Sequence, residues 1–145
     1  MMTMKLAELL DVSELDVLDH LAREITVPVV DGPQAQGDLI VLPLDMVRVV
    51  TLASWGRWRS VPWHGVELVR GVAGNNPHTL VAADGTCQWT PGVHDPLGLA
   101  VGMFDNTAPV YLIHPEHGGT GVAPGRWVVR RQQESGRRRR GLVAD

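Results

Sequence analysis

Four side chains that could bind a metal ion or transfer protons lie in two segments of the sequence. His78 follows the turn-forming residues GNNP, and His114, Glu116 and His117 lie in the segment YLIHPEHGG. Imidazole and carboxylate groups are ordinary ligands of zinc and iron. If two strands place His78 beside the other three residues, together they would form a site for a divalent transition metal.

Such a site would resemble that of the cupins, and the resemblance implies a metal-dependent enzyme whose substrate is unknown. Cupins carry a His-x-His pair followed by Glu in one strand, whereas here His78 is followed by Thr79 and Leu80. The alternative is structural: His114 bonds to loop backbone and Glu116 is solvated. We favour this second interpretation, so we expect no cofactor and lean against an enzyme.

Nucleophilic chemistry has little support in the sequence. The single cysteine, Cys87, lies in DGTCQWT, which carries no thiol-enzyme signature and predicts a buried core residue. It cannot form an internal disulfide, so an oxidising compartment is not implied. The motifs G-x-S-x-G, G-x-G-x-x-G and the P-loop are all missing from the sequence.

A tryptophan-rich segment, SWGRWRSVPWHG, predicts a binding surface. It places Trp55, Trp58 and Trp63 among Arg57 and Arg59. Aromatic residues interleaved with arginine can stack on nucleic-acid bases, and they are also enriched at protein interfaces. Because exposed tryptophans without a partner favour aggregation, we expect these side chains to be buried or to contact a partner protein.

The N-terminal residues 1–27 predict an acidic helical hairpin. Apolar residues recur at helical spacing over 6–10 and again over 15–25, and Ser13 can cap the second helix. The second helix would present an apolar face formed by Leu15, Leu18, Leu21, Ala22 and Ile25. We expect this face to pack on the rest of the chain or on a partner.

The same hairpin, LAELLDVSELDVLDHL, resembles the helix-turn-helix of bacterial DNA-binding proteins. Glu14, Asp16 and Asp19 would then face the DNA phosphates and be repelled by them. We therefore do not expect this segment to read DNA.

After Pro28, short apolar runs alternate with turn signals. Strands are predicted at 39–42, 47–52, 66–70, 79–82, 88–89, 99–104, 110–114 and 127–132. This spacing predicts a mainly β fold, a small barrel or sandwich with a cupin-like form as one option. The predicted organisation is a helical arm at 1–27, a β domain at 28–134 and a basic, disordered tail at 135–145.

The two ends of the chain carry opposite charge. Residues 1–25 hold two basic and six acidic side chains, and residues 130–145 hold six arginines against two acidic side chains. We find no signal peptide and no apolar run long enough for a membrane span, so we expect a cytoplasmic protein or one in a particle assembled there. Opposite charges beside apolar surface favour self-association.

A resemblance to a family of small bacterial and phage proteins covers about a hundred residues. It rests on QGDLIVLPL, VELVRGVAGNNPHTL, LIHPEHGGTGVAPGRWVVRRQQE and the terminal LVAD. The resemblance implies no settled activity. We therefore expect a non-catalytic binding or assembly module acting on a protein partner or on itself, with a cupin-like metal enzyme and a nucleic-acid-binding accessory protein as the alternatives.

Overall fold

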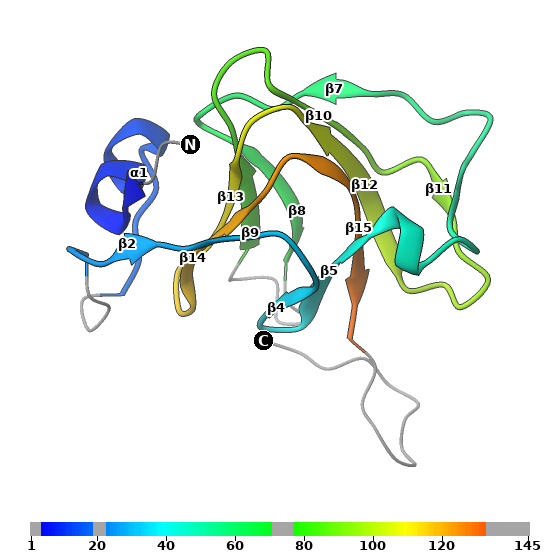
Figure 1. Ribbon diagram of the computed structural model, residues 1–145, viewed down its shortest axis with the longest axis horizontal. Coiled ribbons are helices and arrows are strands. Elements are labelled where there is room, and N and C mark those ends of the chain that lie inside the picture. Colours follow the sequence, from blue (N-terminus) through cyan, green and yellow to red (C-terminus); the bar gives the residue numbers. More distant parts are fainter. Residues whose placement is uncertain (1–3, 19–22, 71–76, 133–145) are drawn as a thin grey trace.

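The computed structural model describes residues 4–18, 23–70 and 77–132. Most of the strand residues belong to two antiparallel-rich sheets that pack on each other (Figure 1). The larger has six strands, in the order β4 (Gln34–Gln36), β5 (Leu39–Pro43), β15 (Gly125–Arg131), β12 (Ala100–Asn106), β10 (Cys87–Thr90) and β7 (Arg59–Ser60). The smaller has five, in the order β3 (Val29–Val30), β14 (Gly118–Val122), β13 (Val110–His114), β9 (Pro77–Val81) and β8 (Val66–Arg70).

The remaining elements are short. Two two-stranded sheets join β1 (Met4–Lys5) to β2 (Thr26–Val27) and β6 (Thr51–Leu52) to β11 (Val93–His94). The helices are α1 (Leu6–Ser13) and the 3₁₀ turn η1 (Leu44–Met46). Within the described ranges no sheet closes on itself, so the predicted β class is confirmed as a sandwich-like fold, while the barrel form is not found. None of the described helices has the length and apolar character that crossing a membrane requires.

The main core lies between the two sheets. Alternate residues of a strand point to opposite faces, so Leu80 and Leu112 face inward from the five-stranded sheet. From the six-stranded sheet, Phe104 and Trp127 meet them. All four side chains are almost completely buried. This packing fixes the sheets against each other.

The outer face of the five-stranded sheet is also covered. Leu6, Leu9 and Leu10 of α1 pack on Tyr111 and Ile113 of β13. Figure 1 shows α1 lying over this end of the molecule. The arm therefore packs on its own chain, which is one of the two arrangements that the sequence left open.

Of the predicted helical hairpin, the described residues contain the first helix and none of the second. Glu14 adopts a left-handed conformation with φ of 60° and ends α1 directly after Ser13, which was predicted to begin a second helix. The described residues 14–18 and 23–25 are not helical. The chain turns back here, and the carbonyls of Ile25 and Arg23 accept hydrogen bonds from the first helical N–H groups of α1, at 2.9 and 2.7 Å.

Seven of the eight predicted strands are present: those at 66–70 and 110–114 match to the residue, and the ends of the other five differ by at most two residues. The predicted strand at 47–52 is wrong except for β6 at its end. Successive turns replace it, in which the amides of Val47 and Val50 bond to the carbonyls three residues earlier, at 3.0 and 2.9 Å.

Strand β14 was not predicted, because its sequence GGTGV contains turn-forming glycines. A Cβ atom at Gly121 would lie 2.8 Å from the carbonyl oxygen of Pro28, and one at Gly119 would lie 3.3 Å from a methyl group of Leu9. Glycine is therefore needed where β3 and α1 approach this strand closely.

Candidate functional site

The three predicted metal-binding histidines do lie together. His78 is on β9, His114 ends β13 and His117 lies in the turn before β14. Their rings form a column, with 4.4 Å between the ring centroids of His78 and His114 and 4.5 Å between those of His114 and His117. His78 and His114 are fully buried, whereas His117 is exposed at the end of the column.

Hydrogen bonds fix the position of the His78 ring. Its Nδ1 lies 3.0 Å from Oε1 of Gln36, and its Nε2 lies 3.1 Å from Oδ1 of Asp38. The amide nitrogen of Gln36 faces the carbonyl oxygen of Leu112 at 2.9 Å, so its oxygen must face His78. Both ring nitrogens of His78 are therefore held by hydrogen bonds to side chains that precede and follow the β4–β5 turn.

The next ring is neutral. Nδ1 of His114 accepts a hydrogen bond from the backbone N–H of Glu116 at 3.1 Å, so this nitrogen carries no hydrogen. The exposed Glu116 thus acts here through its main chain, as the structural interpretation of the sequence expected.

The cluster joins the two sheets of the sandwich. Gln36 comes from the six-stranded sheet, and it bonds to β13 and β9 of the five-stranded sheet through Leu112 and His78. The backbone carbonyl of Asp38 accepts a bond of 2.8 Å from the N–H of Gln132, directly after β15. These buried hydrogen bonds fix the two sheets to each other, which is a structural role.

The metal interpretation gains no support from this geometry. Both ring nitrogens of His78 face hydrogen-bond acceptors. Among the described residues, no three His, Cys, Asp or Glu side chains are placed to hold a metal ion. The metal site stays a prediction, which metal analysis of protein purified without a histidine tag would test.

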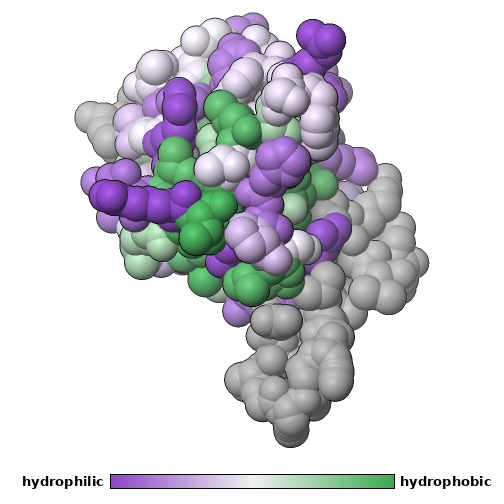
Figure 2. Space-filling view, turned by 90° about the vertical axis from the view of Figure 1, so that its right-hand side faces the viewer, coloured by the Kyte–Doolittle hydropathy of each residue, from purple (hydrophilic) through white to green (hydrophobic). Residues whose placement is uncertain are grey.

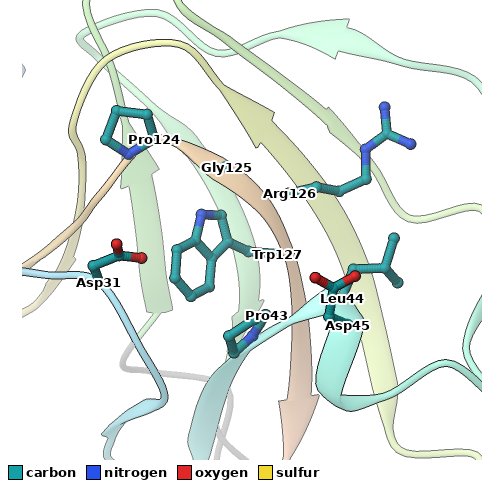
Figure 3. Close-up of a pocket in the computed structure, with 8 residues that line it drawn as sticks. All are labelled: Asp31, Pro43, Leu44, Asp45, Pro124, Gly125, Arg126 and Trp127. Atoms are coloured by element: carbon teal, nitrogen blue, oxygen red, sulfur yellow. The ribbon is translucent and has the colours of Figure 1, made fainter.

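A pocket of about 360 Å³ lies at one edge of the six-stranded sheet. Figure 3 shows the Trp127 indole between the carboxylates of Asp31 and Asp45, with the guanidinium of Arg126 pointing away from it. The indole Nε1 donates to the carbonyl of Ala123 at 3.0 Å, so only apolar ring atoms face the pocket. Two carboxylates beside an aromatic ring suit a cationic group, but the ring is only 2% exposed.

Two apolar pockets flank the arm. One of about 220 Å³ lies between Leu6, Val27 and the exposed ring of His117. A second pocket, of about 140 Å³, lies beside Met4 of the arm and is also lined by Trp63. Trp63 is half-buried and packs against the core cluster of α1, so it is separated from the other two tryptophans that were expected to act with it.

A series of exposed apolar side chains begins at the last residue of η1 and continues along the segment that follows it. Every third residue from 47 to 53 is buried, namely Val47, Val50 and Ala53. A second series, also at every third position, points outward: Met46 is 61% exposed, Val49 59%, Leu52 43% and Trp55 63%. We call these last four residues the apolar ridge. Over residues 44–50 the repeat follows two successive turns that each span three residues, and β6 then carries the chain on to Ala53.

The ridge is firmly supported from below. Val47 and Val50 pack on Met103 of β12 and Val128 of β15. The amide of Ala53 donates to the carbonyl of Gly92 at 2.9 Å. Figure 2, which looks at the face that lies on the right in Figure 1, shows hydrophobic surface there between hydrophilic side chains.

The other predicted binding residues have separate locations. Trp58 is 37% exposed and lies under the guanidinium of Arg126. The Cζ atom of Arg126 is 5.7 Å from the centroid of the Trp58 ring. Leu18 and Ile25 are exposed, whereas Leu15 packs on the core cluster of α1. Leu21 lies outside the described residues. These residues therefore do not form the single helical face that the sequence predicted.

Several residues of the site were missed. Gln36 and Asp38 were noticed only as part of a strand motif, and nothing in their spacing indicated that they would pair with His78. Met46 and Val49 were missed because 47–52 read as a strand. The repeat M-x-x-V-x-x-L-x-x-W, at positions 46 to 55, was the signal that could have found them.

The fold defines an all-β protein built from two packed, open sheets with a helix on one outer face. A family model described as a domain of unknown function, DUF8820, matches residues 35–132, and the chain belongs to this family. The match confirms a family resemblance over the β region and assigns no activity to it. No curated protein and no solved structure matches the chain.

Proposed function

We propose that this chain is a non-catalytic protein-binding or assembly module that acts through the apolar ridge. The observation that carries the proposal is the double three-residue repeat, in which one series of side chains anchors the segment while a second series of large apolar side chains is turned to solvent. Monomeric proteins rarely expose contiguous apolar patches larger than a few hundred Å², and such larger patches mark interaction sites.

The energetics favour a partner on this surface. Full burial of one side chain of this size contributes about 1.5–3 kcal/mol. About half of each ridge side chain is still exposed, so covering all four would contribute on the order of 4 kcal/mol before the entropy cost of association. A rigid support lowers the further cost of ordering the segment on binding.

A protein partner fits the ridge better than a nucleic acid does. Trp55 and Arg57 could stack on bases, but Met46, Val49 and Leu52 offer neither charge nor an aromatic ring to a nucleotide. Aliphatic and aromatic side chains beside arginine are typical of protein interfaces.

The test is site-specific cross-linking in cells that produce the protein. A photoreactive amino acid is placed at position 52 and, as a control, at position 84, which is exposed in the turn between β9 and β10. We expect a discrete adduct with one identified protein from position 52 alone. In purified form that protein should bind the wild type but not the Leu52→Asp variant. Equal adducts from both positions, or none, would overturn the proposal.

A further inference from the structure

The molecule carries two exposed faces of opposite charge. The outer side of α1 presents Glu8, Asp11 and Val12, which are neighbours on a helix surface, and Glu14 follows directly after the helix. Residues 4–18 contain four acidic side chains and one lysine. Val12 is 41% exposed, so this acidic face also offers an apolar contact.

The residues around the apolar ridge are basic by contrast. Arg48, Arg57 and Arg59 are all exposed along the segment 45–59, where the acidic residue is Asp45. The ridge therefore combines apolar side chains with positive charge, and the outer face of α1 combines an apolar side chain with negative charge.

The two faces cannot meet within one molecule. The inner side of α1 is held on the five-stranded sheet by Leu6, Leu9 and Leu10. The ridge rests on the outer face of the six-stranded sheet. Figure 1 places α1 at one end of the long axis and β11, the partner of β6 in the ridge segment, at the other.

We propose that copies of this chain associate head to tail, with the acidic face of α1 in one copy docked on the apolar ridge of the next. This inference rests on the proposed function and names the partner of the ridge. Complementary charge steers and orients such a contact, while the apolar side chains supply most of its affinity. A contact between two different faces repeats from copy to copy, so it builds a ring or a filament.

The charge distribution argues against a contact between two ridges. A two-fold ridge contact would bring three arginines of each copy together, with one aspartate from each copy to offset them. Like charges across an interface oppose association. An eight-residue helix on a short ridge buries little area, so we expect weak, concentration-dependent assembly.

Light scattering and sedimentation of the full chain test the inference with a charge swap. One variant carries Arg57→Glu and Arg59→Glu, which makes the ridge acidic, and the other carries Asp11→Lys and Glu14→Lys, which makes the helix face basic. All four side chains are exposed, so both variants should fold. The wild type should form species larger than a dimer as its concentration rises, and added salt should reduce them.

Each variant alone should stay monomeric, because it presents like charges at both faces. An equimolar mixture should assemble again, because every junction between the two variants pairs opposite charges. The Asp84→Lys control should behave as the wild type. A wild type that is monomeric at all concentrations, assembly that persists in either variant alone, or assembly that requires nucleic acid would each overturn the inference.

These outcomes separate the inference from the proposed function. A monomeric wild type that still gives a ridge-specific adduct with a different protein, lost in Leu52→Asp, overturns self-assembly and leaves the ridge as a binding surface. A monomeric wild type without any ridge adduct overturns both.

Discussion

Nε2 of His78 lies 3.1 Å from Oδ1 of Asp38, with both side chains almost fully removed from solvent. Asp38 lies between β4 and β5 of the six-stranded sheet, and His78 is the second residue of β9 in the five-stranded sheet. The pair therefore joins the two sheets. The second ring nitrogen of His78, Nδ1, lies 3.0 Å from Oε1 of Gln36, so both nitrogens of the ring have a partner. The first prediction concerns the stability that depends on this pair.

Removing either partner should destabilise the fold, because the other is left buried without its hydrogen-bonding partner. We expect Asp38→Ala and His78→Ala each to lower the free energy of unfolding by about 1–3 kcal/mol. The double variant should lose clearly less than the sum of the two. Urea unfolding measures all three, with Asp105→Ala as a control, since its ion pair with Arg126 is exposed. Additive losses would show that the pair does not act as a unit.

Asp95 predicts a pH-dependent contribution to stability. Burial alone would raise its pKa, but hydrogen bonds from the Leu97 amide and from Arg130 outweigh burial and hold the pKa below its ordinary value. Arg130 makes two bonds to the carboxylate, of 2.9 and 2.8 Å. A lowered folded-state pKa means that the stabilisation is present above the unfolded-state pKa and is lost as the pH falls through the folded-state value.

Asp95→Asn should therefore lower the free energy of unfolding by about 3 kcal/mol at neutral pH. This gap, the difference in unfolding free energy between the wild type and the variant, should narrow as the solution is acidified below about pH 4. Thermal unfolding over a pH series measures the gap. Asp16→Asn is the matched control, because its bond to Arg23 is exposed to solvent. A gap that stays constant with pH would contradict the role of the carboxylate charge.

Cys87 should be chemically inert in the folded protein. Burial, with a smaller contribution from the nearby charge of Asp105, raises the pKa of its thiol to about 12. The thiol is therefore protonated at pH 8, and the thiolate is the reactive form. Iodoacetamide should label it only after unfolding, whereas a cysteine introduced by Ser60→Cys on the exposed neighbouring strand β7 should react in the folded state. Rapid labelling of native wild type would refute this assignment.

Gly121 should tolerate no side chain. Its Cβ position would be 2.8 Å from the Pro28 carbonyl and 3.1 Å from the Tyr111 ring, so Gly121→Ala must push β3 away from β14. We expect it to lower the free energy of unfolding by about 1–3 kcal/mol. Gly32→Ala is the control, because nothing lies within 4 Å of its Cβ position and its change should stay within about 1 kcal/mol. Equal effects in the two variants would exclude crowding at β14 as the cause.

The sequence by itself determined the β class and most of the strands. Apolar runs such as 110–114 and 127–132, bounded by turn residues, specify strands because their side chains must be buried between packed sheets. It also placed Cys87 in the core and α1 at the N-terminus, since both depend on local pattern.

Only the tertiary structure decided the rest. Glycine has a low strand propensity, yet the glycines of β14 form a strand. Their lack of a side chain lets α1 and β3 pack close to β14. The position of the His78 ring depends on Gln36 and Asp38, some forty residues away along the chain. The apolar ridge exists because buried Val47 and Val50 fix which side of the turns faces solvent. Such relationships depend on long-range packing, and local sequence patterns carry no record of it.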